Sequence, residues 1–327
     1  MTKKVLVTGG AGYIGSHTVL ALNEAGYETV VYDNLSTGFK ESVLPPARFV
    51  RGDLQDSDKL RDLLSSEKFD SVIHFAAHIS VPESVEKPLE YYYNNSANTI
   101  GLVRAAVEHG IENFIFSSTA AVYGIPEQIP VPETAPLNPI NPYGRSKLVS
   151  EWSLQDAGNA HPDFNYVILR YFNVAGADPE GRLGQSTPGA THLIKTASKC
   201  AVGKKERLSV FGTDFPTFDG TGVRDYIHVT DLAWAHVKGL EYLEQGNSSE
   251  IFNCGYGKGY SVNQIIQVVK EISGSDFAVE EVERRVGDPA ELVCDPEKIT
   301  QVLGWEPRHD DIREIASSAY QWEKISN

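Results

Sequence analysis

The residues most able to do chemistry in this chain are a tyrosine and a lysine four positions apart, Tyr143 and Lys147. On a helix, side chains with this spacing lie on the same face, one above the other. A phenol titrates near pH ~10, and an adjacent ammonium favours the phenolate and lowers that pKa. Such a tyrosine can take a proton from an alcohol near neutral pH. Because the spacing also occurs by chance on solvated helices, the hypothesis requires a nicotinamide-binding segment and a hydroxyl donor elsewhere.

A glycine-rich loop near the N-terminus meets the first requirement. Residues 5–8 form a short apolar run, Gly9, Gly12 and Gly15 follow at three-residue intervals, and residues 16–25 are typical of a helix. Glycines permit a tight turn and a close approach of the backbone to a pyrophosphate, whose charge faces the helix N-terminus. The order strand, loop, helix therefore predicts a dinucleotide site, although the spacing is G-x-x-G-x-x-G rather than G-x-G-x-x-G.

Acidic residues after the next two strands indicate which dinucleotide binds. Asp33 ends the strand predicted over 28–32. It lies about 20 residues beyond the loop, where a carboxylate accepts hydrogen bonds from the adenosine ribose and repels a 2′-phosphate. NAD is therefore favoured over NADP, and the alternative is that Asp33 is only a turn residue before Asn34. Asp53, after the strand predicted over 48–51, is expected near the adenine.

Residues at the ends of two later strands are also expected to contribute to the dinucleotide site. The strand over 71–75 is followed by Ala76, which is small enough for a cofactor to lie across it. The strand over 113–116 ends in hydroxyl-bearing residues that include Ser117 and Thr119. In a parallel sheet with right-handed crossovers, ligands gather at the carboxyl ends of the strands. The hydroxyl donor and the cofactor are therefore expected at the same edge.

Alternating strands and helices predict an α/β fold, a Rossmann-type doubly wound parallel sheet. We expect residues 1–173, with a return near 228–257, to form the NAD-binding domain, and 174–327 to form mainly a smaller, interleaved substrate-binding domain. Asn94 lies inside a helix predicted over 88–109, where asparagine is unfavourable, which suggests a ligand contact. The later elements are predicted as helices over 189–202, 230–243, 261–272, 296–303 and 312–322, and strands over 208–211, 250–254 and 277–282.

The composition of the chain disfavours several classes of protein and of binding partner. The formal net charge of -15 in 327 residues disfavours nucleic acid and anionic membranes as partners. No apolar run approaches the roughly 18 residues that span a bilayer, and no signal peptide is expected at the N-terminus. Cys200, Cys254 and Cys294 fit neither a disulfide framework nor a metal site. We expect a cytoplasmic protein with reduced thiols and no metal.

Together these motifs resemble those of the extended short-chain dehydrogenase/reductase superfamily, through residues 8–15, 117–119 and 143–147. Within it the chain is similar to the UDP-glucose 4-epimerase family. That closer similarity is carried by residues 87–92, 169–173 and 219–229. The resemblance covers nearly the whole chain.

The resemblance implies a role for each reacting group. Tyr143 is the catalytic acid and base, Lys147 holds the nicotinamide ribose and lowers the tyrosine pKa, and Thr119, where a serine is common, hydrogen-bonds the reacting sugar oxygen. A lysine frequent in the family is replaced by Ile79, which removes a potential contact to a cofactor phosphate. The expected NAD-binding residues are Gly9, Gly12, Tyr13, Ile14, Gly15, Asp33, Asn34, Leu35, Ser36, Thr37, Gly38, Asp53, Leu54, Phe75, Ala76, Asn94, Ser117, Tyr143, Lys147 and Phe172.

A UDP-sugar is the substrate that the resemblance implies. An acidic protein needs local cations to bind a diphosphate, and Arg224 and Arg285 are the candidates because guanidinium groups grip phosphate at two points. Their alternative is a surface salt bridge. Asp288 could accept from the uridine ribose. The other implied substrate contacts are Thr119, Tyr143, Asn173, His192 (often Asn in the family), Leu193, Phe211, Tyr226 and, near the hexose C2 substituent, Leu292.

The implied reaction interconverts UDP-galactose and UDP-glucose, in galactose metabolism, through a transient 4-keto sugar and NADH. A homodimer joined through helices near 88–110 and 143–158 is also implied. The alternatives are a UDP-N-acetylglucosamine 4-epimerase, a bifunctional or pentose-accepting enzyme, a 4,6-dehydratase or a non-catalytic NAD-sensing protein. A dehydratase typically has an Asp-Glu pair after Thr119, where this chain has Ala120 and Ala121. Intact Thr119, Tyr143 and Lys147 argue against the sensor.

Overall fold

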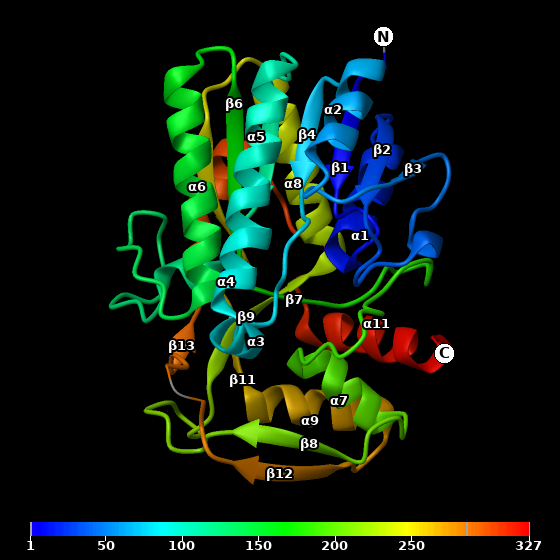
Figure 1. The fold of residues 1–327 in the computed structure, drawn as a ribbon. Helices are drawn as coiled ribbons and strands as arrows, with labels where there is room; N and C mark the ends of the chain where they lie inside the picture. Colours follow the sequence, from blue (N-terminus) through cyan, green and yellow to red (C-terminus); the bar gives the residue numbers. More distant parts are fainter. Residues whose placement is uncertain (1, 286, 327) are drawn as a thin grey trace. The chain divides into compact units, whose positions relative to one another are not determined.

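A computed structural model describes residues 2–285 and 287–326 (Figure 1). The chain divides into two compact units, and both are discontinuous in sequence. Unit 1 comprises Met1–Gly124, Leu137–Arg170 and Ala233–Phe252, and unit 2 comprises Ile125–Pro136, Tyr171–Leu232 and Asn253–Asn327. The NAD-binding domain was predicted to run without interruption to residue 173, whereas the segment 125–136 makes its contacts within unit 2.

Most elements of unit 1 belong to an alternating βα pattern. In chain order they are β1 (Lys4–Thr8), α1 (Tyr13–Glu24), β2 (Glu28–Asp33), η1 (Lys40–Ser42), β3 (Arg48–Arg51), α2 (Ser57–Ser66), β4 (Ser71–His74), α3 (Val81–Glu86), α4 (Pro88–Tyr91), η2 (Tyr92–Ala97), α5 (Asn98–Glu108), β5 (Asn113–Ser117), η3 (Ala120–Tyr123) and α6 (Pro142–Ala160). The strands β6 (Asn165–Tyr171) and β10 (Glu250–Cys254) and the helix α8 (Val229–Glu244) lie mainly in unit 1.

The strands of unit 1 form one sheet in the order β10-β6-β5-β4-β1-β2-β3. The pairs that join β1 to β2 and β4, β2 to β3, and β5 to β4 and β6 are all parallel. Apolar residues follow one another along these strands because helices cover both faces of such a sheet. The Rossmann-type fold predicted from the sequence is confirmed.

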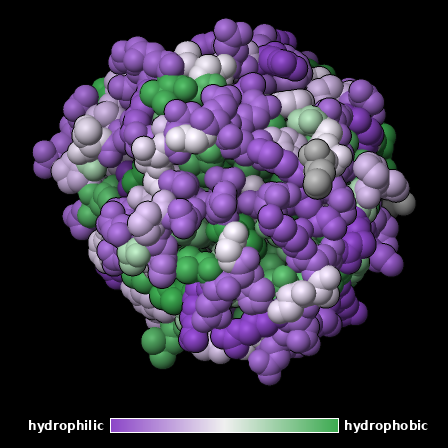
Figure 2. All heavy atoms as spheres, turned by 90° about the horizontal axis from the view of Figure 1, so that it is seen from above, coloured by the Kyte–Doolittle hydropathy of each residue, from purple (hydrophilic) through white to green (hydrophobic). Residues whose placement is uncertain are grey.

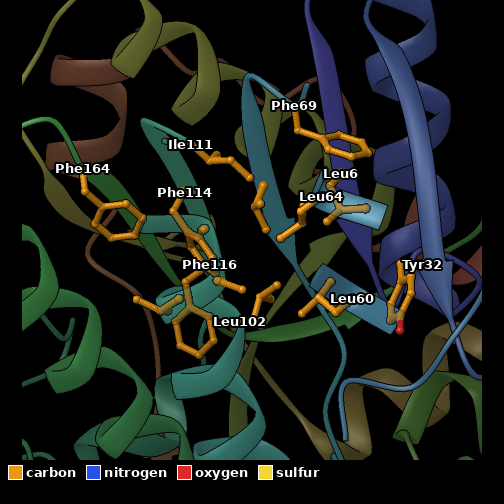
Figure 3. Close-up of a cluster of buried hydrophobic side chains, with 14 of the residues drawn as sticks. Leu6, Tyr32, Leu60, Leu64, Phe69, Leu102, Ile111, Phe114, Phe116 and Phe164 are labelled. Atoms are coloured by element: carbon orange, nitrogen blue, oxygen red, sulfur yellow. The ribbon is translucent and has the colours of Figure 1, made fainter. Parts of the chain in front are cut away.

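A core of aromatic and aliphatic side chains fills one side of this sheet (Figure 3). Leu6, Phe114 and Phe116 point from the strands toward Leu60 of α2 and Leu102 of α5. Helices α5 and α6 run side by side over this face (Figure 1). This packing fixes α6, which carries Tyr143 and Lys147, against the end of β5.

The long helix predicted over 88–109 is wrong in its middle. Residues Tyr92–Ala97 form a wider π-helical segment, η2, between α4 and α5. Asn95 explains the widening, because its side chain leaves the helix surface and bonds elsewhere. Its Oδ1 accepts from the His78 N–H (2.8 Å), and its Nδ2 donates to the His78 carbonyl (3.0 Å) and the Ser146 Oγ (3.0 Å). π-Helical turns often mark functional sites, and this one is tied directly to α6.

Unit 2 contains shorter elements that pair with distant segments. They are β7 (Asn173–Ala175), α7 (Leu193–Ala201), β8 (Arg207–Phe211), β9 (Val223–His228), β11 (Gly259–Ser261), α9 (Val262–Ser273), β12 (Ala278–Val282), β13 (Glu291–Leu292), α10 (Glu297–Leu303) and α11 (Ile312–Ile325). One sheet has the order β11-β9-β13 with β7 also paired to β9, and β12 pairs with β8. The helices α7, α9 and α11 pack together over an apolar core.

Local signals located some of these elements and misplaced others. The helix predicted over 261–272 begins with a capping box, because the Ser261 hydroxyl accepts from the Gln264 N–H and the Gln264 side chain accepts from the Ser261 N–H. The helix predicted from residue 189 begins only at Leu193, since Gly189 has φ +69° and interrupts the helix. The strands β7, β9, β11 and β13 were not predicted. Three of them have only two or three residues, and β9, although six residues long, pairs only with segments that are remote in sequence.

Two expectations from composition can be compared with the structure. Cys200, Cys254 and Cys294 are buried, free thiols, as expected. Within the described residues, no helix is both long enough and apolar enough to cross a bilayer. Hydrophilic side chains dominate the face seen in Figure 2, with hydrophobic groups in smaller areas between them.

Candidate active site

The glycine loop of unit 1 has two positions, Gly9 and Gly15, at which a side chain would clash with the backbone. Gly9 has φ +75°, and a Cβ on it would lie 2.5 Å from the backbone nitrogen of Ala76. A Cβ on Gly15 would lie 2.3 Å from the Gly9 carbonyl oxygen. The loop leads directly into α1, which begins at Tyr13 rather than at residue 16. Tyr13, Ile14 and Gly15 therefore form its first turn, where N–H groups and the helix dipole favour an anion.

Asp33 joins the glycine loop to the end of β2. Its Oδ2 accepts from the Ala11 N–H (3.0 Å) and its Oδ1 from the Leu35 N–H (2.8 Å). Burial raises the pKa of this carboxyl above its ordinary value, and the two backbone bonds oppose that rise. Each carboxylate oxygen has a second lone pair, so Asp33 can hold the loop and still accept from a ribose hydroxyl.

The loop after β2 lies against the glycine loop. A Cβ on Gly38 would lie 2.6 Å from the Ala11 carbonyl oxygen, and Leu35 has φ +63°, which is unusual for a branched side chain. The Asn34 Nδ2 donates to the Asp53 Oδ2 at 2.8 Å. The structure thus brings together the cofactor residues predicted over 33–38, Asp53 and the adjoining Leu54.

We expect Asp33→Ala to weaken NAD binding roughly 10- to 100-fold, because hydrogen bonds to charged groups contribute about 1.5–3 kcal/mol. The affinity for NADP should fall less, since the carboxylate that repels a 2′-phosphate is gone. Titration of the protein with each dinucleotide checks this. Asp58→Ala, which removes an exposed carboxylate from the first turn of α2, is the matched control. Unchanged NAD affinity in a folded Asp33→Ala protein would contradict the assignment.

Residues after β4 and in η2 line the same edge of the sheet. The N–H groups of Phe75 and Ala76 donate to the Thr8 carbonyl at 2.8 and 3.2 Å. The Phe75 ring packs on His236 of α8, with ring centroids 4.7 Å apart. Asn94 donates to Asn95 at 3.0 Å. Phe172, which was predicted to bind the same cofactor, is a buried residue of unit 2.

The helix α6 presents Tyr143 and Lys147 from its first two turns. Asn141 caps the helix by accepting from the Gly144 N–H (2.9 Å), and Pro142 is its first residue. Tyr143 is 7% exposed and Lys147 is 2% exposed. The Lys147 ammonium donates to the Ser117 carbonyl at 2.8 Å and lies 4.7 Å from the Phe116 ring centroid. This places the lysine directly at the end of β5.

Burial lowers the pKa of Lys147 to about 7, while the negative charge of Glu151 opposes that fall. The lysine is therefore poised between its two protonation states near neutral pH. Its neighbour His74 is neutral there, because burial and the positive charge of Lys147 lower the histidine pKa to about 3. The Thr99 hydroxyl gives its proton to the Asn95 carbonyl (2.6 Å) and so accepts from the His74 Nε2–H (2.8 Å). His74 is therefore buried and uncharged near pH 7, and of these two residues only Lys147 can carry a positive charge there.

Thr119 lies at the start of η3, next to the first turn of α6. Its Oγ1 accepts from the Ala121 N–H at 3.1 Å, and a hydroxyl that accepts one bond still has a proton to donate. Gly144 lets the two segments meet, since a Cβ there would lie 2.7 Å from the Ala121 carbonyl oxygen. Thr119 is 8% exposed. The structure thus brings Ser117, Thr119, Tyr143 and Lys147 to one edge of the unit 1 sheet.

The predicted substrate residues all belong to unit 2, apart from Thr119 and Tyr143. Arg224 on β9 forms an ion pair with Asp288, with Nη2 and Oδ1 2.6 Å apart, and its Nη1 donates to the Val223 carbonyl at 2.8 Å. The Arg285 guanidinium lies 3.8 Å from the centroid of the Phe211 ring. Arg224 and Arg285 are therefore oriented by a carboxylate and an aromatic face rather than left as mobile surface cations.

The remaining substrate residues are placed by the strands of unit 2. Tyr226 pairs with Asn173 in the β7–β9 register, and Leu292 pairs with Arg224 in the β9–β13 register. His192 and Leu193 lie at the N-terminus of α7. Both pairs include a residue of β9, a strand that lies within the motif 219–229 but was not predicted.

Three further buried residues, which were not predicted as part of the site, lie close in sequence or space to Thr119 and Lys147. Ser118, Glu151 and Arg170 are buried and joined by hydrogen bonds. The signal available in the sequence was the spacing of Glu151, four residues after Lys147 on the same helix. Arg170 lies in the motif 169–173 that carries the family resemblance, but only the tertiary structure places its strand beside α6.

Comparison with known proteins shows which family the chain resembles. Residues 5–255 match the model of the NAD dependent epimerase/dehydratase family. A UDP-glucose 4-epimerase from Azospirillum brasilense is 51% identical over 321 residues, which cover 98% of this chain and 92% of that protein.

Solved structures resemble the chain over nearly its full length. A UDP-glucose 4-epimerase from Brucella ovis, in complex with NAD, matches with a TM-score of 0.94 and 44% identity, covering 98% of both chains. A UDP-Glc/GlcNAc 4-epimerase from Campylobacter jejuni matches with a TM-score of 0.87 and 49% identity, covering 98% of this chain and 99% of that one. The present chain therefore belongs to the NAD dependent epimerase/dehydratase family.

Proposed function

We propose that this protein is an isomerase that interconverts UDP-galactose and UDP-glucose, with NAD as its cofactor. The observation that carries the proposal is the buried set of Thr119, Tyr143 and Lys147 at the end of β5. The same unit contains the glycine loop, in which Gly9 and Gly15 leave no room for a side chain, and the Asp33 carboxylate, which would repel a 2′-phosphate. Full-length similarity to UDP-glucose 4-epimerases supports the choice of substrate.

In the proposed reaction, the phenolate of Tyr143 takes the proton of the sugar 4-hydroxyl, and Thr119 donates a hydrogen bond to the same oxygen. Lys147 favours the phenolate and hydrogen-bonds the nicotinamide ribose. NAD, when bound, supplies the reversible acceptance of the hydride from the hexose C4. Tyr143 then returns its proton to the 4-keto oxygen after the sugar has turned its other face to the site.

We assign the nucleotide half of the substrate to residues of unit 2. Arg224 and Arg285 would bind the diphosphate, and Asp288 would accept from the uridine ribose. Firm anchoring of the nucleotide leaves the hexose free to rotate, which an epimerase requires because two epimers react in one site. The segment around Leu292 is proposed to set how large a C2 substituent is accepted.

An epimerisation assay tests the proposal. Purified protein supplied with NAD and UDP-galactose should form UDP-glucose with no net consumption of NAD, as read by nucleotide-sugar chromatography. A second candidate is activity on UDP-N-acetylgalactosamine, which is favoured by the 49% identity to the Campylobacter jejuni enzyme. A parallel assay with that sugar separates the two, and turnover of the acetylated sugar alone would overturn the first choice. No turnover of either would favour an NAD-binding protein without catalysis.

We further propose that the protein is cytoplasmic, binds neither nucleic acid nor membrane, and forms a homodimer. Support for a dimer comes from a row of exposed apolar side chains along the helices from α4 to α6. Leu89 is 80% exposed, Tyr93 57%, Ile100 45% and Trp152 52%. Leu89, Tyr93 and Ile100 come from the successive segments α4, η2 and α5, and Trp152 comes from α6, which contacts all three segments. Exposed apolar side chains gathered on neighbouring helices are typical of an interface.

We expect Leu89→Lys to convert the dimer to monomers, because a charge would be buried against an apolar partner. Sedimentation at micromolar concentration measures the change. Val302→Lys, which also introduces a charge at an exposed apolar position, on α10 (45% exposed), is the control and should leave the mass unchanged. A wild-type protein that sediments as a monomer would contradict the proposed homodimer.

A further inference from the structure

A fully buried ion pair lies beneath the catalytic edge of unit 1. Arg170 is 2% exposed and Glu151 is not exposed at all. The Arg170 Nε lies 3.1 Å from each carboxylate oxygen of Glu151, and its Nη2 lies 2.6 Å from Oε2. Removing two charges from water is costly, and apolar residues of similar volume are often as stabilising. A role in stability alone is therefore a weak explanation for this pair.

The pair reaches the strand end that carries the hydroxyl donor. The Ser118 Oγ donates to the Glu151 carboxylate. Ser118 stands between Ser117, whose carbonyl accepts from the Lys147 ammonium (2.8 Å), and Thr119. The strand end is thus fastened to α6 at two successive residues, once by Lys147 and once by Glu151.

Arg170 extends the same contacts to η3. Its Nη1 donates to the Tyr123 hydroxyl at 3.0 Å, and its guanidinium carbon lies 5.2 Å from the centre of that ring. Tyr123 is the last residue of η3, the helix that Thr119 caps. Residues on both sides of Thr119 are therefore held by one ion pair.

Glu151 also acts on the charge of Lys147. It follows Lys147 by one helical turn, and its negative charge favours the ammonium form against the effect of burial. Besides Tyr143, one helical turn before Lys147, further titratable groups that act on these two residues include Arg170 on β6, which pairs with Glu151, Tyr166 on the same strand, and His74 on β4. Of these, His74 is neutral near pH 7.

We propose that Glu151, held by Arg170, is a positioning residue for the epimerisation. Through Ser118 it fixes the Ser117–Thr119 strand end against α6, so that the Thr119 hydroxyl and the Lys147 ammonium keep their places beside Tyr143. The inference rests on the proposed function, since it concerns the same reacting groups. It adds residues that touch neither the cofactor nor the sugar.

Ser118→Ala is the first test, because it removes only the hydroxyl between Glu151 and the strand end. We expect kcat for UDP-galactose to fall about tenfold, with KM and the NAD affinity within about twofold of wild type, since misplaced reacting groups lower kcat more than binding. Wild-type kcat in a folded Ser118→Ala protein would overturn the proposal. If the wild-type protein itself does not epimerise UDP-galactose, the proposed function has failed instead.

Glu151→Gln tests the electrostatic part. Without its carboxylate, Lys147 should lose its proton more readily, so the basic limb of the kcat–pH profile should move to lower pH by roughly one unit. The matched control is Glu323→Gln, which breaks the buried Lys195–Glu323 ion pair of unit 2. It should lower the melting temperature while leaving the kcat–pH profile unchanged. An unmoved profile in Glu151→Gln, or an equal shift in Glu323→Gln, would contradict the role of Glu151.

Discussion

Replacing Tyr143 with phenylalanine is expected to lower kcat for UDP-galactose about 10³-fold, within the range that general acid–base catalysis contributes. The change removes only the phenolic hydroxyl of Tyr143. The aromatic ring is kept and still fills the site, where the side chain is 7% exposed. Binding of NAD and of UDP should therefore change little. Turnover measured by conversion of UDP-galactose, together with separate titrations of NAD and UDP, checks both parts of the expectation.

The control for this change is Tyr242→Phe on α8, where the ring packs edge-on against Phe252 with centroids 6.0 Å apart. This change removes a phenolic hydroxyl from the same unit but outside the candidate site, and the variant should keep normal turnover. Normal turnover in Tyr143→Phe would exclude Tyr143 as the acid and base. A loss of NAD binding in parallel with turnover would instead indicate a structural role.

Lys147→Met is expected to lower kcat by about 10²- to 10⁴-fold without lowering the stability of the fold. The ammonium that favours the Tyr143 phenolate is lost, while a side chain of similar length fills the buried position. Burial depresses the pKa of Lys147 to about 7, so the folded state binds the lysine proton less tightly than the unfolded chain does. Charging Lys147 therefore disfavours folding, and methionine avoids that cost.

The sign of the stability change follows from the same pKa. Below pH about 7 the lysine is charged in both the folded and the unfolded state. The stability that Lys147→Met gains over the wild-type protein is therefore largest there. It shrinks as the pH rises from about 7 toward the ordinary lysine pKa near ~10.4, as neutral lysine becomes common to both states. Melting temperatures at pH 6 and pH 9 measure this difference. A protein that is strongly destabilised at pH 6 would mean that Lys147 serves mainly as a structural donor to Ser117.

Local sequence signals predicted the parts of the site that depend on neighbouring residues. The glycine loop, the strand-end position of Asp33 and the spacing of Tyr143 and Lys147 follow from short-range geometry, and unit 1 contains each of them. The helix over 88–109 failed at η2, because Asn95 bonds to His78 and Ser146 rather than staying on the helix surface. Side-chain bonds to remote residues cannot be read from helical periodicity.

The sequence by itself determined the Rossmann-type fold of this protein and predicted the loop proposed to bind NAD and the groups proposed to react. These features depend only on residues close together in the sequence: the periodicity of strands and helices, the spacing of the glycines, and the one-turn separation of Tyr143 and Lys147. The tertiary structure alone decided that Arg170 meets Glu151 beneath the strand end, that Asp288 meets Arg224, and that Lys147 is buried enough to titrate near pH 7. These features depend on which distant segments pack together and on how much water the packing excludes, and neither is a property of spacing along the chain.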